Sequence, residues 1–69
     1  MLRKTIEFQK KRAEAGAPSA QYDLGMRYLT GDGLEKDPKL ARKWLYSSAT
    51  NGNSQAVKKL KELKDLEKK

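Results

Sequence analysis

The chain repeats itself at a spacing of 36 residues, and this repeat is the feature that most constrains its fold. When the sequence is aligned with itself at that spacing, residues of the same kind coincide: Ala13 with Ala49, Gly16 with Gly52, Ala20 with Ala56, Leu24 with Leu60, and the aromatic Phe8 with Trp44. A period in the mid-thirties is the size of one helix–turn–helix unit in a stacked array. The 69 residues therefore predict one full unit with a fraction of a unit on each side.

Local signals divide the chain into four helices. Gly16 and Gly52 suit helix C-caps, because glycine accepts the left-handed backbone conformation found there. Pro18 suits the first turn of a helix, and Asp37 followed by proline is an N-cap signal. The predicted helices cover residues 2–15, Pro18 to about Leu29, Pro38 to about Asn51, and Asn53 or Ser54 to about Lys68.

Short loops between these helices imply antiparallel neighbours. The predicted fold class is therefore all-α, with two antiparallel helical hairpins stacked as a short solenoid fragment. We expect a single domain over residues 1–69: a preceding helix at 1–16, a full repeat at 17–52 and a C-terminal capping helix at 53–69.

Small and apolar residues at helical spacing define the predicted core. Ala20, Leu24 and Tyr28 recur every four residues, as a buried helical face requires. Gly25 inside a helix costs about 1 kcal/mol relative to alanine, so we expect it to serve close packing. The predicted core residues are Phe8, Ala20, Leu24, Gly25, Tyr28, Ala41, Trp44, Ala49 and Leu60.

One ordered set of residues carries a resemblance to a known family. The set is Ala13, Gly16, Ala20, Gln21, Leu24, Gly25, Tyr28, Gly31, Asp32, Gly33, Leu34, Asp37, Ala41, Trp44, Ala49 and Gly52. It is similar to the Sel-one-like repeat, a relative of the tetratricopeptide repeat. The resemblance implies a non-catalytic helical repeat that holds another protein. Lys61 and Lys64 depart from it, because they stand where Gly25 and Tyr28 stand one repeat earlier. Polar residues there indicate that nothing stacks beyond the fourth helix.

The residue inventory argues against catalysis. Without cysteine or histidine, the chain lacks thiolate and imidazole zinc ligands and the Ser-His and Cys-His nucleophile pairs. Asp32, Glu35 and Asp37 share one loop, but Lys36 and Pro38 interrupt the alternating ligands that a calcium loop needs. We expect no catalytic residue, no metal site and no cofactor, and hence no enzyme activity.

The net charge of +7 lies mainly at the two ends of the chain. Such a balance favours solubility or acidic partners: nucleic acid, an anionic membrane or an acidic protein surface. No uninterrupted apolar stretch reaches the length of a signal-peptide core or of a membrane helix. The sequence therefore predicts a cytoplasmic protein without a membrane partner.

Helical repeats bind partners on the concave side, which the first helix of each hairpin lines. The residues predicted there are Tyr22, Met26 and Arg27 on the second helix and Lys58, Lys59 and Glu62 on the fourth. Tyrosine, methionine and arginine are enriched at interfaces. We expect an adaptor or a small inhibitor or accessory protein that binds a peptide or an acidic protein surface across both helices, with the lysines steering the partner.

Two alternatives stay open. The basic charge alone could bind nucleic acid, with affinity that falls steeply as salt rises. An apolar stripe on the fourth helix, which includes Val57, Leu63 and Leu66, could instead support self-association.

Overall fold

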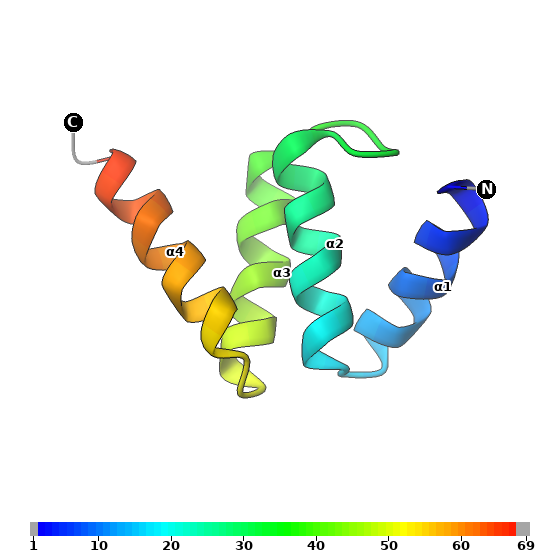
Figure 1. Cartoon of the computed structure of the whole chain (residues 1–69), viewed down its shortest axis with the longest axis horizontal. Helices are drawn as coiled ribbons and strands as arrows, with labels where there is room; N and C mark the ends of the chain where they lie inside the picture. The colour runs from blue at the N-terminus through cyan, green and yellow to red at the C-terminus, as the bar shows by residue number, and fades with distance from the viewer. Residues whose placement is uncertain (1, 68–69) are drawn as a thin grey trace.

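The computed structural model describes residues 2–67, which form four helices joined by short connections (Figure 1). The helices are α1 (Leu2–Glu14), α2 (Pro18–Thr30), α3 (Pro38–Thr50) and α4 (Ser54–Glu67). Consecutive helices run antiparallel; α2 and α3 lie side by side at the centre, α1 packs on α2, and α4 packs on α3. The predicted all-α class is confirmed, and the helix boundaries agree within a residue or two; Lys68 lies outside the described residues.

Two turns that are 36 residues apart show the repeat in the backbone itself. Gly16 donates its N–H to the carbonyl of Ala13 at 3.0 Å, and Gly52 donates to the carbonyl of Ala49 at 3.1 Å. Both glycines are left-handed, with φ of 96° and 100°. The predicted glycine C-caps therefore end α1 and α3 in the same way.

Asp37 forms the predicted N-cap of α3. Its Oδ1 accepts from the backbone N–H of Lys39 at 3.1 Å and of Leu40 at 3.2 Å. Its own N–H donates to the carbonyl of Tyr28 at 2.9 Å. The cap therefore stabilises the start of α3 and also attaches the preceding loop to α2.

Gly25 lets α2 and α3 approach closely. A Cβ at this position would lie 2.9 Å from Cγ of Leu45 and 3.1 Å from the carbonyl oxygen of Ala41. Both neighbours are fully buried. The packing reason expected for a glycine inside a helix is thus present.

The core runs along the helix junctions. Its buried apolar residues are Ile6, Ala13, Ala20, Leu24, Ala41, Leu45 and Ala56. Tyr28 and Trp44 are partly buried and pack against the α1–α2 part of this core. Ala49 and Leu60 are also partly buried. Every predicted core residue except one is therefore at least partly covered.

The exception is Phe8, whose prediction as a core residue was wrong: it is 64% exposed. Its repeat equivalent Trp44 lies on α3, which packs against α2 and also against α4. Phe8 lies on α1, which packs mainly against α2 and buries Ile6 and Ala13. The same repeat position is covered in one helix and open in the other because the number of neighbouring helices differs.

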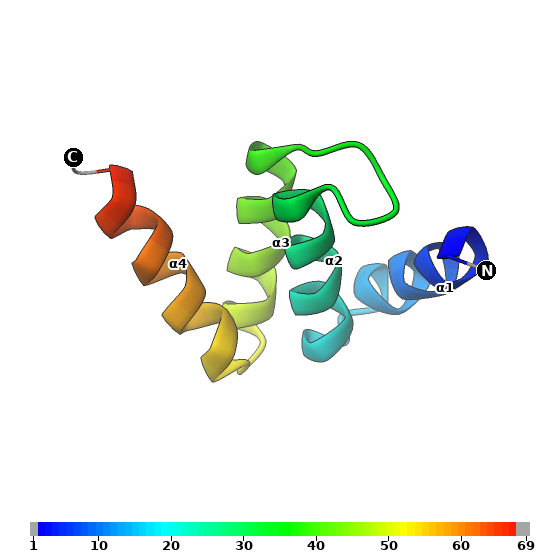
Figure 2. The same ribbon diagram turned by 45° about the horizontal axis from the view of Figure 1, so that its top comes forward.

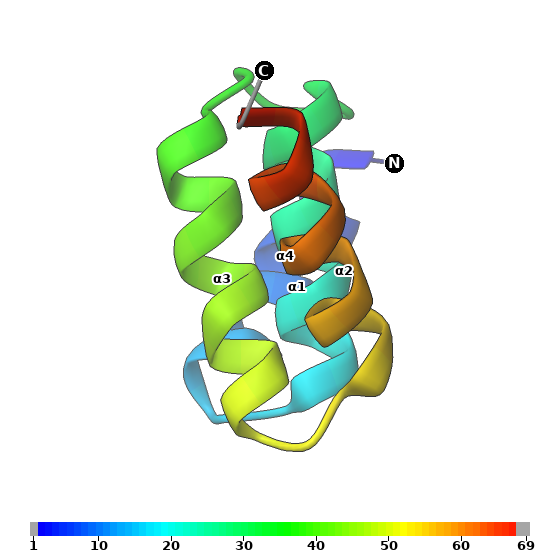
Figure 3. The ribbon, with the colours of Figure 1, turned by 90° about the vertical axis from the view of Figure 1, so that its left-hand side faces the viewer.

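Two buried polar side chains connect the helices. Gln21 is 4% exposed; its Nε2 donates to the carbonyl of Ala13 at 2.9 Å, and its Oε1 accepts from Nδ2 of Asn51 at 3.0 Å. Ser48 donates its hydroxyl to the carbonyl of Pro18 at 2.6 Å. Figures 1 and 3 show the α1–α2 and α3–α4 turns at the same end of the molecule. Gln21 therefore bridges the two turns while satisfying its own polar atoms.

Candidate functional site

The outer helices diverge from the central pair: α1 from α2, and α4 from α3, with increasing distance from the turn that joins them (Figures 1 and 2). A hollow lies at each of these junctions. The α1–α2 hollow has a volume of about 400 Å³ and is lined by Gln9, Tyr22, Asp23, Met26, Arg27, Thr30 and Asp32. The α3–α4 hollow has a volume of about 330 Å³ and is lined by Arg42, Tyr46, Leu60, Leu63, Lys64 and Glu67.

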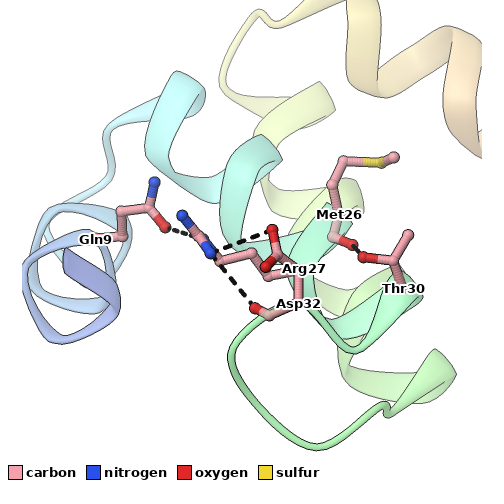
Figure 4. A network of polar contacts seen from close by, with 5 residues as sticks. All are labelled: Gln9, Met26, Arg27, Thr30 and Asp32. Carbon is pink, nitrogen blue, oxygen red and sulfur yellow. Dashed lines mark hydrogen bonds and ion pairs between the residues drawn. The ribbon is translucent and has the colours of Figure 1, made fainter. Parts of the chain in front are cut away.

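Arg27 is held in place on both sides within the α1–α2 hollow (Figure 4). Its Nε donates to Oε1 of Gln9 at 2.7 Å, which joins α2 to α1. Its NH1 lies 3.3 Å from Oδ2 of Asp32 and also reaches the carbonyl of that residue at 3.4 Å. With its side chain only 16% exposed, the guanidinium is oriented by contacts that exist before any partner binds.

Tyr22 and Met26 are half-buried on the same helix and complete the lining. The hydroxyl of Thr30 donates to the carbonyl of Met26 at 3.0 Å, so this donor is already used within α2. The structure thus brings together all three residues predicted on the second helix. Their position follows from helical phase, because α2 turns Ala20 and Leu24 to the core.

The charge of this hollow differs from the overall charge of the chain. Arg27 is its one basic lining residue, whereas Asp23 and Asp32 are acidic. The formal charge of the lining is therefore −1. Because Arg27 already pairs with Asp32, it is not an unpartnered cation awaiting an acidic group.

The three residues predicted on the fourth helix lie elsewhere. Lys58, Lys59 and Glu62 are on α4, which packs on α3, and none of them lines the α1–α2 hollow. Lys59 pairs with Glu62 through its Nζ at 3.0 Å, and Lys58 is exposed. The predicted surface across the second and fourth helices is therefore not one continuous hollow.

Sequence reasoning missed two lining residues that matter, Gln9 and Asp32. Gln9 aligns with the buried Leu45 under the 36-residue shift, so the repeat gave no indication of a polar contact there. Asp32 stood out only as a turn residue between two glycines. Helical phase on α1 could have suggested Gln9, because it lies three residues after the buried Ile6.

The sequence model of the Sel1 repeat matches residues 18–53, which is just over half of the chain. The chain belongs to the Sel1 repeat family. The match begins at the first residue of α2 and ends at Asn53, which caps α4 by accepting from the N–H of Gln55 at 2.9 Å. The repeat therefore consists of α2, α3 and the turn that follows, and the sequence resemblance is confirmed.

One relative is the protein named chitin synthase regulator SKT5 from Saccharomyces cerevisiae. It is 34% identical over 56 residues, which cover 81% of this chain but only 8% of the yeast protein. The chain thus corresponds to a small part of that relative. No solved structure matches the chain. Sel1 repeats are protein–protein interaction modules, so the general class predicted from the sequence holds.

No helix of residues 2–67 has both the length and the apolar character required to cross a bilayer. No group of three or more acidic side chains converges within this part of the chain as a metal site would require.

Proposed function

We propose that this chain is a non-catalytic protein-interaction module, an adaptor or a small regulatory subunit, whose α1–α2 hollow holds a peptide segment of a partner protein. The observation that carries this proposal is the orientation of Arg27 by Gln9 and Asp32 beside Tyr22 and Met26. Residues of these types are enriched at binding hot spots. A side chain that is already ordered also loses less entropy when the partner binds.

The charges divide the partner surface into two parts. The α1–α2 hollow carries one more acidic than basic group, which disfavours an acidic peptide segment over Tyr22 and Met26. The acidic surface of the partner then faces α4, where Lys58 has no ion pair within residues 2–67 and Lys59 keeps Glu62 as a partner. Exposed charges of this kind mainly speed association and contribute little to final affinity.

The named relative supports the general class of this proposal. SKT5 is called a regulator of chitin synthase, which is a role exercised on another protein. A module that binds a partner without chemistry of its own fits such a role.

Affinity capture from the native lysate, with nuclease and moderate salt, tests the proposal. The bait is compared with the double variant Tyr22→Ala/Met26→Ala and with Phe8→Ala, an exposed aromatic outside the hollow. We expect one stoichiometric protein with the wild type and with Phe8→Ala, and its loss with the double variant. A protein captured equally well by all three baits would contradict the assignment to this hollow.

Nucleic-acid association is the second candidate, because five basic side chains of α1 are exposed: Arg3, Lys4, Lys10, Lys11 and Arg12. Binding of this kind depends on phosphate neutralisation, so its affinity falls linearly with salt on logarithmic axes. Capture of ribosomal and other nucleoprotein components that disappears with nuclease would establish this candidate. It would also remove the role proposed for Tyr22 and Met26.

A further inference from the structure

The α3–α4 hollow is the apolar counterpart of the polar hollow between α1 and α2. Its floor is formed by the partly buried Leu60 and Leu63, and Tyr46 beside them is 69% exposed. Leu66, in the last turn of α4, adds another exposed apolar side chain at 65%. Exposed apolar side chains gathered at one helix junction make it a candidate interaction surface.

The 36-residue repeat explains why this junction is open. Ile6 of α1 is 6% exposed and belongs to the core cluster that contains Leu24, which is fully buried. The equivalent residues at the second junction are Arg42 and Leu60. Arg42 is charged and 48% exposed, and α4 packs on α3 alone whereas α2 packs on both α1 and α3, so within residues 2–67 Leu60 lacks the apolar cover that Leu24 receives.

The rim of this hollow is basic. Arg42 pairs with Glu67 across the two helices, which leaves that pair neutral. Lys64 also lines the hollow, and it makes no hydrogen bond or ion pair within residues 2–67. An apolar group that enters the hollow therefore meets uncompensated positive charge at its edge.

From this arrangement we propose a second docking site, independent of the α1–α2 hollow, for an acidic segment of a partner protein. An apolar side chain of that segment fills the space over Leu60 and Leu63 and stacks against Tyr46, and a neighbouring carboxylate pairs with Lys64. Burial of apolar surface in the pocket supplies most of the affinity, and the charged contacts fix the position of the bound segment.

Two observations disfavour a second copy of the chain as the occupant. Its net charge of +7 would bring like charge to a basic rim. Lys61 of α4 also stands at the repeat position of Gly25 of α2. At Gly25, even a Cβ would lie 2.9 Å from Cγ of Leu45 on the packed helix α3. A helix of another copy therefore cannot pack on α4 as closely as α3 packs on α2.

The test is a selection of random short peptides displayed on phage against the full chain, followed by affinity measurements with synthetic peptides from the winners. We expect winners with an aliphatic or aromatic residue beside Asp or Glu. Tyr46→Ala and Lys64→Glu should each weaken their binding about tenfold, since central contacts of an interface contribute at least this much. Both residues are exposed, so neither variant should disturb the fold, which far-UV circular dichroism checks.

Val57→Ala is the matched control, because Val57 is an exposed apolar residue of α4 outside the hollow. It should leave binding unchanged, as should Tyr22→Ala/Met26→Ala at the other hollow. The proposal is overturned if no peptide is selected, if the winners are basic, or if they bind Tyr46→Ala as tightly as the wild type. A dimer in sedimentation that Tyr46→Ala dissociates would also overturn it, in favour of a second copy.

Discussion

Gly25 of α2 faces Leu45 of α3 so closely that a Cβ on the glycine would lie 2.9 Å from Cγ of the leucine. In an exposed helix, replacing glycine by alanine stabilises a protein by about 1 kcal/mol. Here the added methyl group overlaps a buried side chain, and overpacking costs about 1–3 kcal/mol. We therefore expect Gly25→Ala to lower the thermal midpoint, by about 4–8 °C for each kcal/mol lost.

The cause can be isolated with a double-mutant cycle, because Leu45→Ala removes the atoms that the new methyl group meets. In that background Gly25→Ala should cost less than it does in the wild type, although the carbonyl of Ala41 remains 3.1 Å away. Equal costs in the two backgrounds would show that the overlap with Leu45 is not responsible.

Trp44 and Phe8 occupy the same position of successive repeats but differ in burial. Trp44 packs against the core cluster, whereas Phe8 is 64% exposed. Trp44→Ala should cost about 3 kcal/mol or more, which is enough to unfold a small domain. Phe8→Ala should change stability by less than about 0.5 kcal/mol. In urea denaturation we expect a midpoint close to that of the wild type for Phe8→Ala, and a strongly lowered midpoint or no folded baseline for Trp44→Ala; similar behaviour of the two variants would contradict the placement of either ring.

Gln21 should contribute to stability through its two hydrogen bonds rather than through its size. Gln21→Met keeps the length of the side chain but leaves Asn51 without its acceptor and Ala13 without the side-chain donor. Asn51 is exposed and the carbonyl of Ala13 keeps the N–H of Gly16, so we expect a loss of about 0.5–1.5 kcal/mol, the net contribution of a typical intramolecular hydrogen bond. Hydrogen exchange should show faster opening of both turns; a variant as stable as the wild type would show that the bridge is dispensable.

Asp37 should stabilise α3 as an N-cap. Asp37→Ala removes the acceptor for the N–H groups of Lys39 and Leu40, and such losses cost about 1 kcal/mol. Asp37→Asn keeps a side-chain oxygen at the same place and should lose much less. Thermal unfolding followed by circular dichroism separates the two; equal destabilisation would point to the charge of Asp37 rather than to its cap.

The candidate site was predictable only where helical phase determined it. Tyr22, Met26 and Arg27 could be placed together because the apolar stripe of α2 identifies the opposite face of the same helix. The contacts of Arg27 with Gln9 and Asp32 could not, since they depend on how far α1 tilts from α2 and on the path of the loop after Gly31. The separation of the α1–α2 hollow from Lys58 and Lys59 depends on another tertiary contact, because α4 packs on α3 and not beside α1.

The ends of the helices could be read from residues that are close together in the chain. Left-handed glycines at Gly16 and Gly52, and the capping residue Asp37, mark the helix ends through the conformations and hydrogen bonds of a few adjacent residues. The tertiary structure alone decided which helix faces are covered. Phe8 and Trp44, or Leu24 and Leu60, have equivalent places in the repeat, but the burial of each side chain depends on the helices that lie beside it. Coverage is a property of neighbours distant in the chain, so no local pattern encodes it.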